Sequence, residues 1–364
     1  MFFGRISYCL VMVLFAVHAT EGIALDQTKD DLRRAYERVF VKTDVDRLKT
    51  NPKLYVWNTS ILLQSLVVMY EATGEVSYLD RFAEIGKAVL ENRADRAGIR
   101  DARGNLRRVW LNSVHQNKDF GYLVGTGMVA YPLVRFASIV KSKSELEARF
   151  GALSSAIVRD ATEAVEAFEH NWDEVEGVYR FSNDDPNAAL ASKILPINQY
   201  LAFARTLIYL DHIVDTTKYE TRARRMAMRF KADLAYDSQH DAYTWGYWPE
   251  EHNHPEDISH AAIDVGFVAE SVKLDQGVFS TTDVKRFANT LEDRVVVDGN
   301  IAHDVTGKGE ALVPQAVGLW VGLEHLSQKS FDTLLGYYSA VSANDVVPRP
   351  HYVLMGIANM LAAL

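Results

Sequence analysis

The stretch PINQYLAFARTLIYLDHIVDTTKYETRARRMAMRF, residues Pro196–Phe230, decides the fold. Its first half, up to Leu210, is apolar nearly all round, whereas its second half, from Lys218, carries charged residues on one face. A helix that is apolar on every side is buried, and a helix with one polar face is half-buried. The stretch therefore predicts a buried helix, a short turn and a half-buried helix packed beside it.

The same plan recurs along the chain. Four more segments follow it: Trp57–Arg93, Asp119–Glu169, Asp257–Arg294 and Val313–Val341. The five hairpins recur at intervals of roughly 50–65 residues, which is typical of a repeat architecture. An N-terminal helix (about Asp26–Phe40) and a C-terminal helix (about Arg349–Leu364) remain, and together they would make a sixth hairpin.

This alternation predicts an all-α protein, an (α/α)6-type toroid of helical hairpins with room for one extra hairpin, built as a single domain over residues 25–364. The alternative is an open solenoid of helical pairs. A solenoid would lack long loops rich in polar and aromatic residues, so the sequence favours the closed ring.

The N-terminal residues 1–24 have the pattern of a secretory signal peptide. Arg5 precedes an apolar run, Ile6–Val17, that is too short to span a bilayer, and Ala24 offers a cleavage site. The single cysteine, Cys9, lies within this segment, so the mature chain would have no disulfide. We expect a periplasmic or secreted protein without a membrane span in the mature chain, and the net charge of −9 argues against nucleic acid as a partner.

Long connections join the hairpins, and in a toroid they all emerge at one end of the ring. They are Asn92–Phe120, Asn171–Leu195, Tyr236–Asp257, Val295–Val313 and Ala343–Pro350. Long structured loops in a compact domain are usually functional. We therefore expect a polar cleft at that end.

Polar residues at the starts of the apolar helices belong to the same cleft. The candidates for binding substrate are Trp57, Asn58, Asn198, Gln199, Asp264, His351 and Tyr352, with His115 in a neighbouring loop. Helix N-termini also direct free N–H groups there, which favours an anionic ligand.

One wall of the cleft is YTWGYWPEEHNHPEDISHAAID, Tyr243–Asp264. Trp245, Tyr247 and Trp248 are a candidate stacking platform for sugar rings, which Trp57 and Trp110 would extend, although aromatic rings in a loop can also pack onto the core.

The histidines of this segment have three interpretations. His252, His254 and His260 could bind a divalent metal, but the spacing lacks the second half of a zinc signature, so we expect no cofactor. In the second interpretation the histidines are surface residues without a role. In the third, His260 or His254 is a general base or a hydrogen-bond donor to a substrate carboxylate. His260 lies one turn before Asp264, which predicts a hydrogen-bonded pair.

The turn TGEVSYLD, Thr73–Asp80, and the helical hairpins resemble α/α-toroid carbohydrate-active enzymes, most of all the uronate polysaccharide lyases of the alginate and glucuronan type. This resemblance implies β-elimination on an anionic, uronate-containing polysaccharide. The implied roles are neutralisation of the carboxylate by Asn198 and Arg349, a base at His260 or His254, and an acid at Tyr247 with Tyr243 and Tyr352 in reserve.

Two alternatives remain. An inverting glycoside hydrolase acting on a bacterial or plant polysaccharide would need two carboxylates, and the cleft offers Glu250, Glu251, Glu256, Asp257, Asp264 and Glu310. A non-catalytic glycan-binding protein would need the aromatic platform alone.

Overall fold

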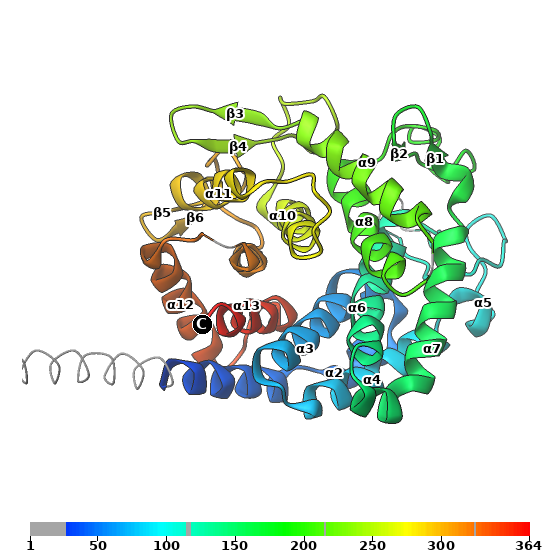
Figure 1. Cartoon of the computed structure of the whole chain (residues 1–364), viewed down its shortest axis with the longest axis horizontal. Coiled ribbons are helices and arrows are strands. Elements are labelled where there is room, and N and C mark those ends of the chain that lie inside the picture. Colours follow the sequence, from blue (N-terminus) through cyan, green and yellow to red (C-terminus); the bar gives the residue numbers. More distant parts are fainter. Residues whose placement is uncertain (1–26, 114–117, 215, 324) are drawn as a thin grey trace, which may run out of the picture.

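The computed structural model describes residues 27–113, 118–214, 216–323 and 325–364, so the predicted signal peptide and His115 lie outside the described residues. Within these ranges, six helical segments form an inner wall (Figure 1): α3 (Ser60–Thr73), α6 (Leu123–Lys141), α8 (Ile197–Asp211), α10 (Ile258–Lys273), η5 (Pro314–Gly322) and α13 (Pro350–Ala362). The outer layer consists of a helix over residues 27–42, α4 (Val76–Glu91), α7 (Ser144–Glu166), α9 (Lys218–Ala232), α11 (Thr281–Thr290) and α12 (Gln328–Ala343).

The ring closes because α13 packs against α3. Each inner segment contacts the next one around the circle, in the order α3, α6, α8, α10, η5 and α13. The N-terminal helix completes the outer layer beside this seam, since Tyr36 hydrogen-bonds Ser65 of α3 at 2.9 Å and its ring meets Tyr78 of α4. The predicted toroid is thus confirmed, and the open solenoid is excluded.

Burial follows the hydrophobic pattern of the sequence. Every residue of α8 from Ile197 to Leu210 is buried. Its partner α9 buries one face, through Tyr219, Ala223, Met226, Ala227 and Phe230, and exposes charged residues on the other. By length and composition α6 would suffice to cross a membrane, against our expectation that no segment would, but 89% of its apolar window is buried inside the ring.

The long connections carry small two-stranded ribbons and short helical turns. The ribbons are β1 (Trp172–Asp173) with β2 (Val178–Tyr179), β3 (Ala235–Asp237) with β4 (Ala242–Thr244), and β5 (Val296–Val297) with β6 (Asn300–Ile301), all antiparallel. The turns are α2 (Val45–Thr50), η1 (Pro52–Leu54), η2 (Tyr55–Thr59), α5 (Ala94–Ala97), η3 (Glu169–Asn171) and η4 (Leu291–Val295). Each of the three ribbons follows an outer helix and leads to the start of an inner one.

The fifth inner segment departs from the sequence prediction. The pattern of Val313–Val341 predicts an inner helix like the other five, but η5 is a nine-residue 3₁₀ segment that ends at Gly322. Behind it, the Tyr338 phenol of α12 is inserted between two glycine backbones. A Cβ on Gly318 or on Gly356 would lie 2.2–2.3 Å from atoms of this side chain. The Tyr338 hydroxyl donates to the Gln315 carbonyl at 2.7 Å, which fixes α12 against η5.

Glycine also sets the distance between α6 and α8. A Cβ on Gly127 would lie 2.6 Å from the backbone nitrogen of Phe203, which cannot move without shifting α8. We expect Gly127→Ala to lower the free energy of unfolding by about 1–3 kcal/mol, the usual cost of overpacking. The measurement is urea denaturation followed by circular dichroism.

Gly336→Ala is the matched control. Gly336 is exposed in α12, and an added Cβ would meet no atom within 4 Å. Here the substitution should raise stability by roughly 0.5–1 kcal/mol, because alanine loses less conformational entropy than glycine in a helix. Equal effects of the two substitutions would contradict the close approach of α6 and α8.

Candidate functional site

The N-terminal ends of the inner segments meet at one end of the ring, which we call the mouth. Asp257 is the N-cap of α10, and its Oδ1 accepts hydrogen bonds from the backbone N–H groups of Ser259 (2.9 Å) and His260 (3.2 Å). An acidic side chain at this position is stabilised by the free N–H groups of the first turn. The cap therefore places Asp257 immediately before the first turn of α10 and beside His260, which lies in that turn.

His260 lies between two carboxylates. Its Nδ1 is 2.6 Å from Asp257 Oδ2 and 3.4 Å from Glu256 Oε1. The sequence predicted a pair with Asp264, but that carboxylate accepts from Trp245 Nε1 at 2.9 Å, so the predicted partner is wrong. Asp257 is nearer because it caps the helix from outside its first turn.

The two adjacent carboxyl groups of this cluster, Glu256 and Asp257, have pKa values that are shifted in opposite directions. Burial raises the pKa of Glu256 to about 7. Burial acts in the same direction on Asp257, but the contacts with the His260 imidazole and the hydrogen bonds from Ser259 and the His260 backbone together outweigh it and hold the pKa of Asp257 well below its usual range. Burial alone would lower the pKa of His260, yet its two carboxylate partners raise that pKa to about 10. At neutral pH the mouth thus contains an imidazolium beside an ionised Asp257.

Aromatic rings surround the imidazole. The Tyr247 ring centroid lies 5.6 Å from that of His260, and the half-buried Trp57 lies 6.4 Å from it. Trp248, also half-buried, contacts Tyr247 with a centroid distance of 5.4 Å. Burial raises the pKa of Tyr247 to about 12, and its hydroxyl accepts from Gln199 Nε2 at 3.3 Å. The structure therefore brings Trp57, Tyr247, Trp248 and Gln199 to one site.

Residues from α13 complete the mouth. Asn58 Nδ2 is 3.5 Å from His351 Nδ1, and the rings of His351 and Tyr352 are 4.9 Å apart. Burial lowers the pKa of His351 to about 4, so its imidazole is neutral at neutral pH. Arg349 is exposed immediately before α13, in the left-handed region with φ 45°. The positive charge of the Arg349 guanidinium acts to lower the pKa of both the His351 imidazole and the Tyr352 phenol.

Several predicted site residues occupy other positions. Trp245 is buried against Phe230 and Phe287, and Trp110 is buried with its Nε1 donating to the Val89 carbonyl at 2.8 Å. Both are core residues, so their predicted place in the platform is wrong. Asp264 and Asn198 are also buried, and Oδ1 of each accepts no hydrogen bond among the described residues.

His254 lies in the exposed loop, with 70% of its side chain accessible and its Nδ1 3.8 Å from Glu251 Oε2. The described residues whose ligand atoms are close enough for a metal ion are Glu256, Asp257 and His260, without His252 or His254. The alternative in which His252, His254 and His260 together bind a metal therefore has no support among the described residues.

Sequence reasoning gave little weight to two further acidic residues near inner-helix starts. Asp119 is exposed four residues before α6, and Asp185 is buried in the loop before α8, where burial raises its pKa. The position of Asp119, four residues before an apolar helix, is the signal that would have identified it.

The charge of His260 gives a measurable titration. With ¹⁵N-labelled histidine, one imidazole should keep the nuclear magnetic resonance shifts of an imidazolium at pH 8, well above the ordinary pKa of about 6.5. Because the folded-state pKa is raised, the stabilisation is complete below pH ~6.5 and is lost as the pH rises through about 10.

Asp257→Asn should lower the midpoint of this titration, because it removes the nearer carboxylate. Glu251→Gln, which alters the carboxylate beside the exposed His254, serves as the control and should leave that midpoint unchanged. A wild-type midpoint near 6.5 would rule out the ion pair.

Comparison with known proteins gives fold relatives. No family model matches the chain, and no curated protein matches it. The GH76A α-1,6-mannanase of Salegentibacter sp. HEL1_6, as an inactive variant in complex with α-1,6-mannotriose, superposes with a TM-score of 0.56 at 12% identity, covering 92% of this chain and 98% of that one.

A second relative is the unsaturated glucuronyl hydrolase from Bacillus sp. GL1, with a TM-score of 0.50 at 14% identity over 93% of this chain and 83% of that one. A structure described as UGL with dGlcA-Glc-Rha-Glc superposes with a TM-score of 0.55 at 14% identity, covering 91% of this chain and 95% of that one.

These comparisons overturn the lyase prediction. The relatives are glycoside hydrolases, which matches the hydrolase alternative and not a uronate lyase. The chain has the α/α-toroid fold of carbohydrate-active enzymes.

Proposed function

We propose that this protein is a glycoside hydrolase that cleaves an oligosaccharide or polysaccharide at the mouth of the ring. The observation that carries the proposal is the position of Asp257 at the N-terminus of α10, half-buried, 2.6 Å from His260 Nδ1 and near aromatic rings. Glycoside hydrolysis needs one ionised carboxylate and one proton donor on either side of the glycosidic bond.

Asp257 suits the role of the ionised carboxylate. Its Oδ1 is held by Ser259 and by the backbone of α10, which fixes the side chain without protonating it. Its Oδ2 contacts the imidazolium of His260, which keeps the carboxylate charged in a partly desolvated position. In this arrangement Asp257 activates a water molecule, and His260 is a positioning residue.

The proton donor must come from another element. The distance of 2.6 Å between His260 and Asp257 leaves no room for a water molecule and a sugar ring between them. Asp119 precedes α6, and Asp257 caps α10, so both belong to the end of the ring where the inner helices begin. Asp119 is exposed, unlike Asp185 and Glu256, and we assign it as the acid.

The aromatic rings and the charges indicate the substrate class. Trp57, Tyr247 and Trp248 offer faces on which sugar rings can stack. The imidazolium of His260 and the exposed guanidinium of Arg349 favour a negatively charged sugar such as a uronate. The crystallised relatives hold mannotriose and a dGlcA-containing oligosaccharide, so neutral and acidic sugars both belong in the assay.

We also propose that the protein is exported to the periplasm or secreted. Residues 1–24 have the pattern of a signal peptide, and a periplasmic or secreted enzyme would meet such glycans outside the cytoplasm.

The test is a panel of α-mannan and uronate-containing oligosaccharides assayed by reducing ends. We expect Asp257→Asn and Asp119→Asn each to lower kcat/KM by about 10²–10⁴-fold, the usual contribution of a general acid or base. Asp332→Asn, which alters an exposed carboxylate on the outer helix α12, should leave kcat/KM unchanged.

Two outcomes would count against this function. Glycan binding without release of reducing ends by the wild type would mean a binding protein. Products with the ultraviolet absorbance of a conjugated double bond would mean elimination instead of hydrolysis.

A further inference from the structure

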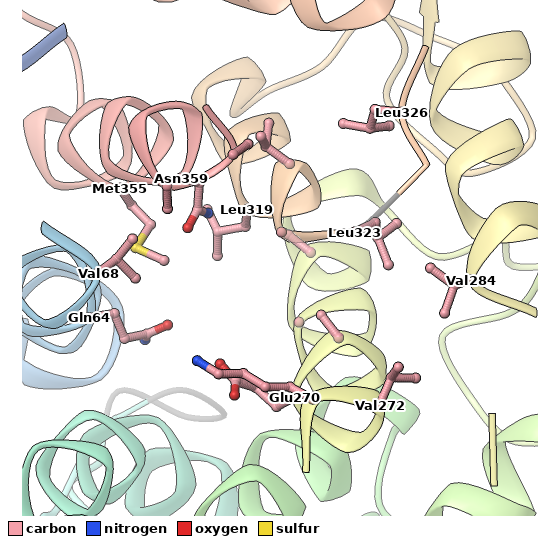
Figure 2. Close-up of a pocket in the computed structure, with 18 of the residues that line it drawn as sticks. Gln64, Val68, Glu270, Val272, Val284, Leu319, Leu323, Leu326, Met355 and Asn359 are labelled. Carbon is pink, nitrogen blue, oxygen red and sulfur yellow. The ribbon is translucent and has the colours of Figure 1, made fainter. Parts of the chain in front are cut away.

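A cavity of about 890 Å³ lies inside the ring, away from the mouth. The middle and C-terminal parts of the inner helices line it, whereas the mouth is built from their N-terminal ends. Figure 2 shows its walls, to which α3, α10, η5 and α13 contribute Gln64, Glu270, Leu319 and Met355. Its volume lies within the range of small-molecule sites, ~300–1,000 Å³.

The short fifth segment explains why the space exists. The other inner helices have 13–19 residues, but η5 has nine and is followed at Leu323 by extended backbone. The wall between α10 and α13 is therefore incomplete in this half of the ring.

One side of the cavity is apolar. It is lined by Val68 of α3, Met355 of α13, and Leu319, Leu323 and Leu326 in and after η5 (Figure 2). These side chains come from separate elements, and each of them can contact the hydrocarbon part of a ligand. Burial of that part would supply most of the binding energy.

The polar side of the cavity contains hydrogen-bond donors that have no acceptor among the described residues. Gln64 is 2% exposed and points into the cavity (Figure 2), and its Nε2 makes no hydrogen bond among the described residues. The buried Arg135 and Arg205 also line the cavity, and Nε of each is without a partner there. A buried donor without a partner costs free energy, and a ligand acceptor removes that cost.

The carboxylate of Glu270 in the same wall is already paired. Glu270 accepts from the Tyr131 hydroxyl at 2.7 Å and from the Tyr209 hydroxyl at 2.5 Å, and it pairs with Arg135 Nη1 at 2.9 Å. Glu270 is therefore satisfied by partners within the chain.

The charges favour the same ligand. The lining contains the cationic side chains of Arg135, Arg205 and Lys273, the carboxylates of Glu71 and Glu270, and the terminal residue Leu364. Both carboxylates pair with Arg135, whereas the guanidinium of Arg205 contacts the Tyr131 ring and Met128 Sδ. An anion near Arg205 would compensate a buried charge that the chain itself leaves without an ion pair among the described residues.

We propose that this cavity binds a small carboxylic acid with an apolar chain, its carboxylate at Gln64 and the arginines and its chain against Leu319, Leu323 and Met355. The site is separate from the mouth and does not depend on the proposed hydrolase activity.

The probe is octanoate, measured by isothermal titration calorimetry on the mature chain. We expect saturable binding that is at least tenfold tighter than that of octanol or octylamine, which have the same chain without a carboxylate. Binding of all three with equal affinity, or no saturable binding of octanoate, would overturn the proposal.

Two variants locate the bound acid. Gln64→Leu removes the unpaired donor at nearly constant volume and should weaken octanoate binding at least tenfold. Gly322→Leu places a larger side chain in the cavity lining, where a Cβ would meet no atom within 4 Å, and should weaken octanoate binding by occupying the cavity. Thermal denaturation verifies that both variants are folded.

Asp257→Asn at the mouth is the control and should leave octanoate binding unchanged. Octanoate binding that is lost in Asp257→Asn but retained in Gln64→Leu and Gly322→Leu would place the ligand at the mouth and overturn the proposal.

Discussion

The need to cover apolar helices on several sides governs this structure. An inner helix such as α8 buries every residue from Ile197 to Leu210, so one neighbour cannot shield it from water. Two flanking inner helices and one outer helix are required, and this holds for the first and last inner segments as well. The ring therefore closes through contact of α13 with α3, the last and the first inner segments of the described chain. Closure in turn gathers the helix N-termini at one mouth.

Much of this architecture was predictable, because the alternation of fully apolar and half-polar helices is a property of sequence. The exception was η5, whose sequence PQAVGLWVG is as apolar as that of its neighbours. Periodicity does not distinguish an α-helix from a short 3₁₀ segment when every residue is apolar. Two glycines and the Tyr338 phenol determine the path there, and this is a tertiary effect that local patterns do not contain.

The site was predictable in location but only partly in chemistry. The sequence placed Trp57, Tyr247, His260 and Tyr352 at the mouth, since all lie at inner-helix starts or in long loops. It could not show which carboxylate meets His260, because residues 257 and 264 both lie within a turn or so of it, and the cap geometry decides between them. The sequence also could not show that Trp245 is buried and Trp248 is half-buried, because the burial of each ring depends on the path of the loop and not on the residue type.

The position of Tyr338 between Gly318 and Gly356 has an evolutionary consequence. The phenol occupies the space in which both glycines would otherwise carry a side chain, so the three positions are coupled in volume. In related chains they should covary as a set. A large residue at the tyrosine position should accompany two glycines, and a small residue there should accompany alanine or larger side chains at the other two.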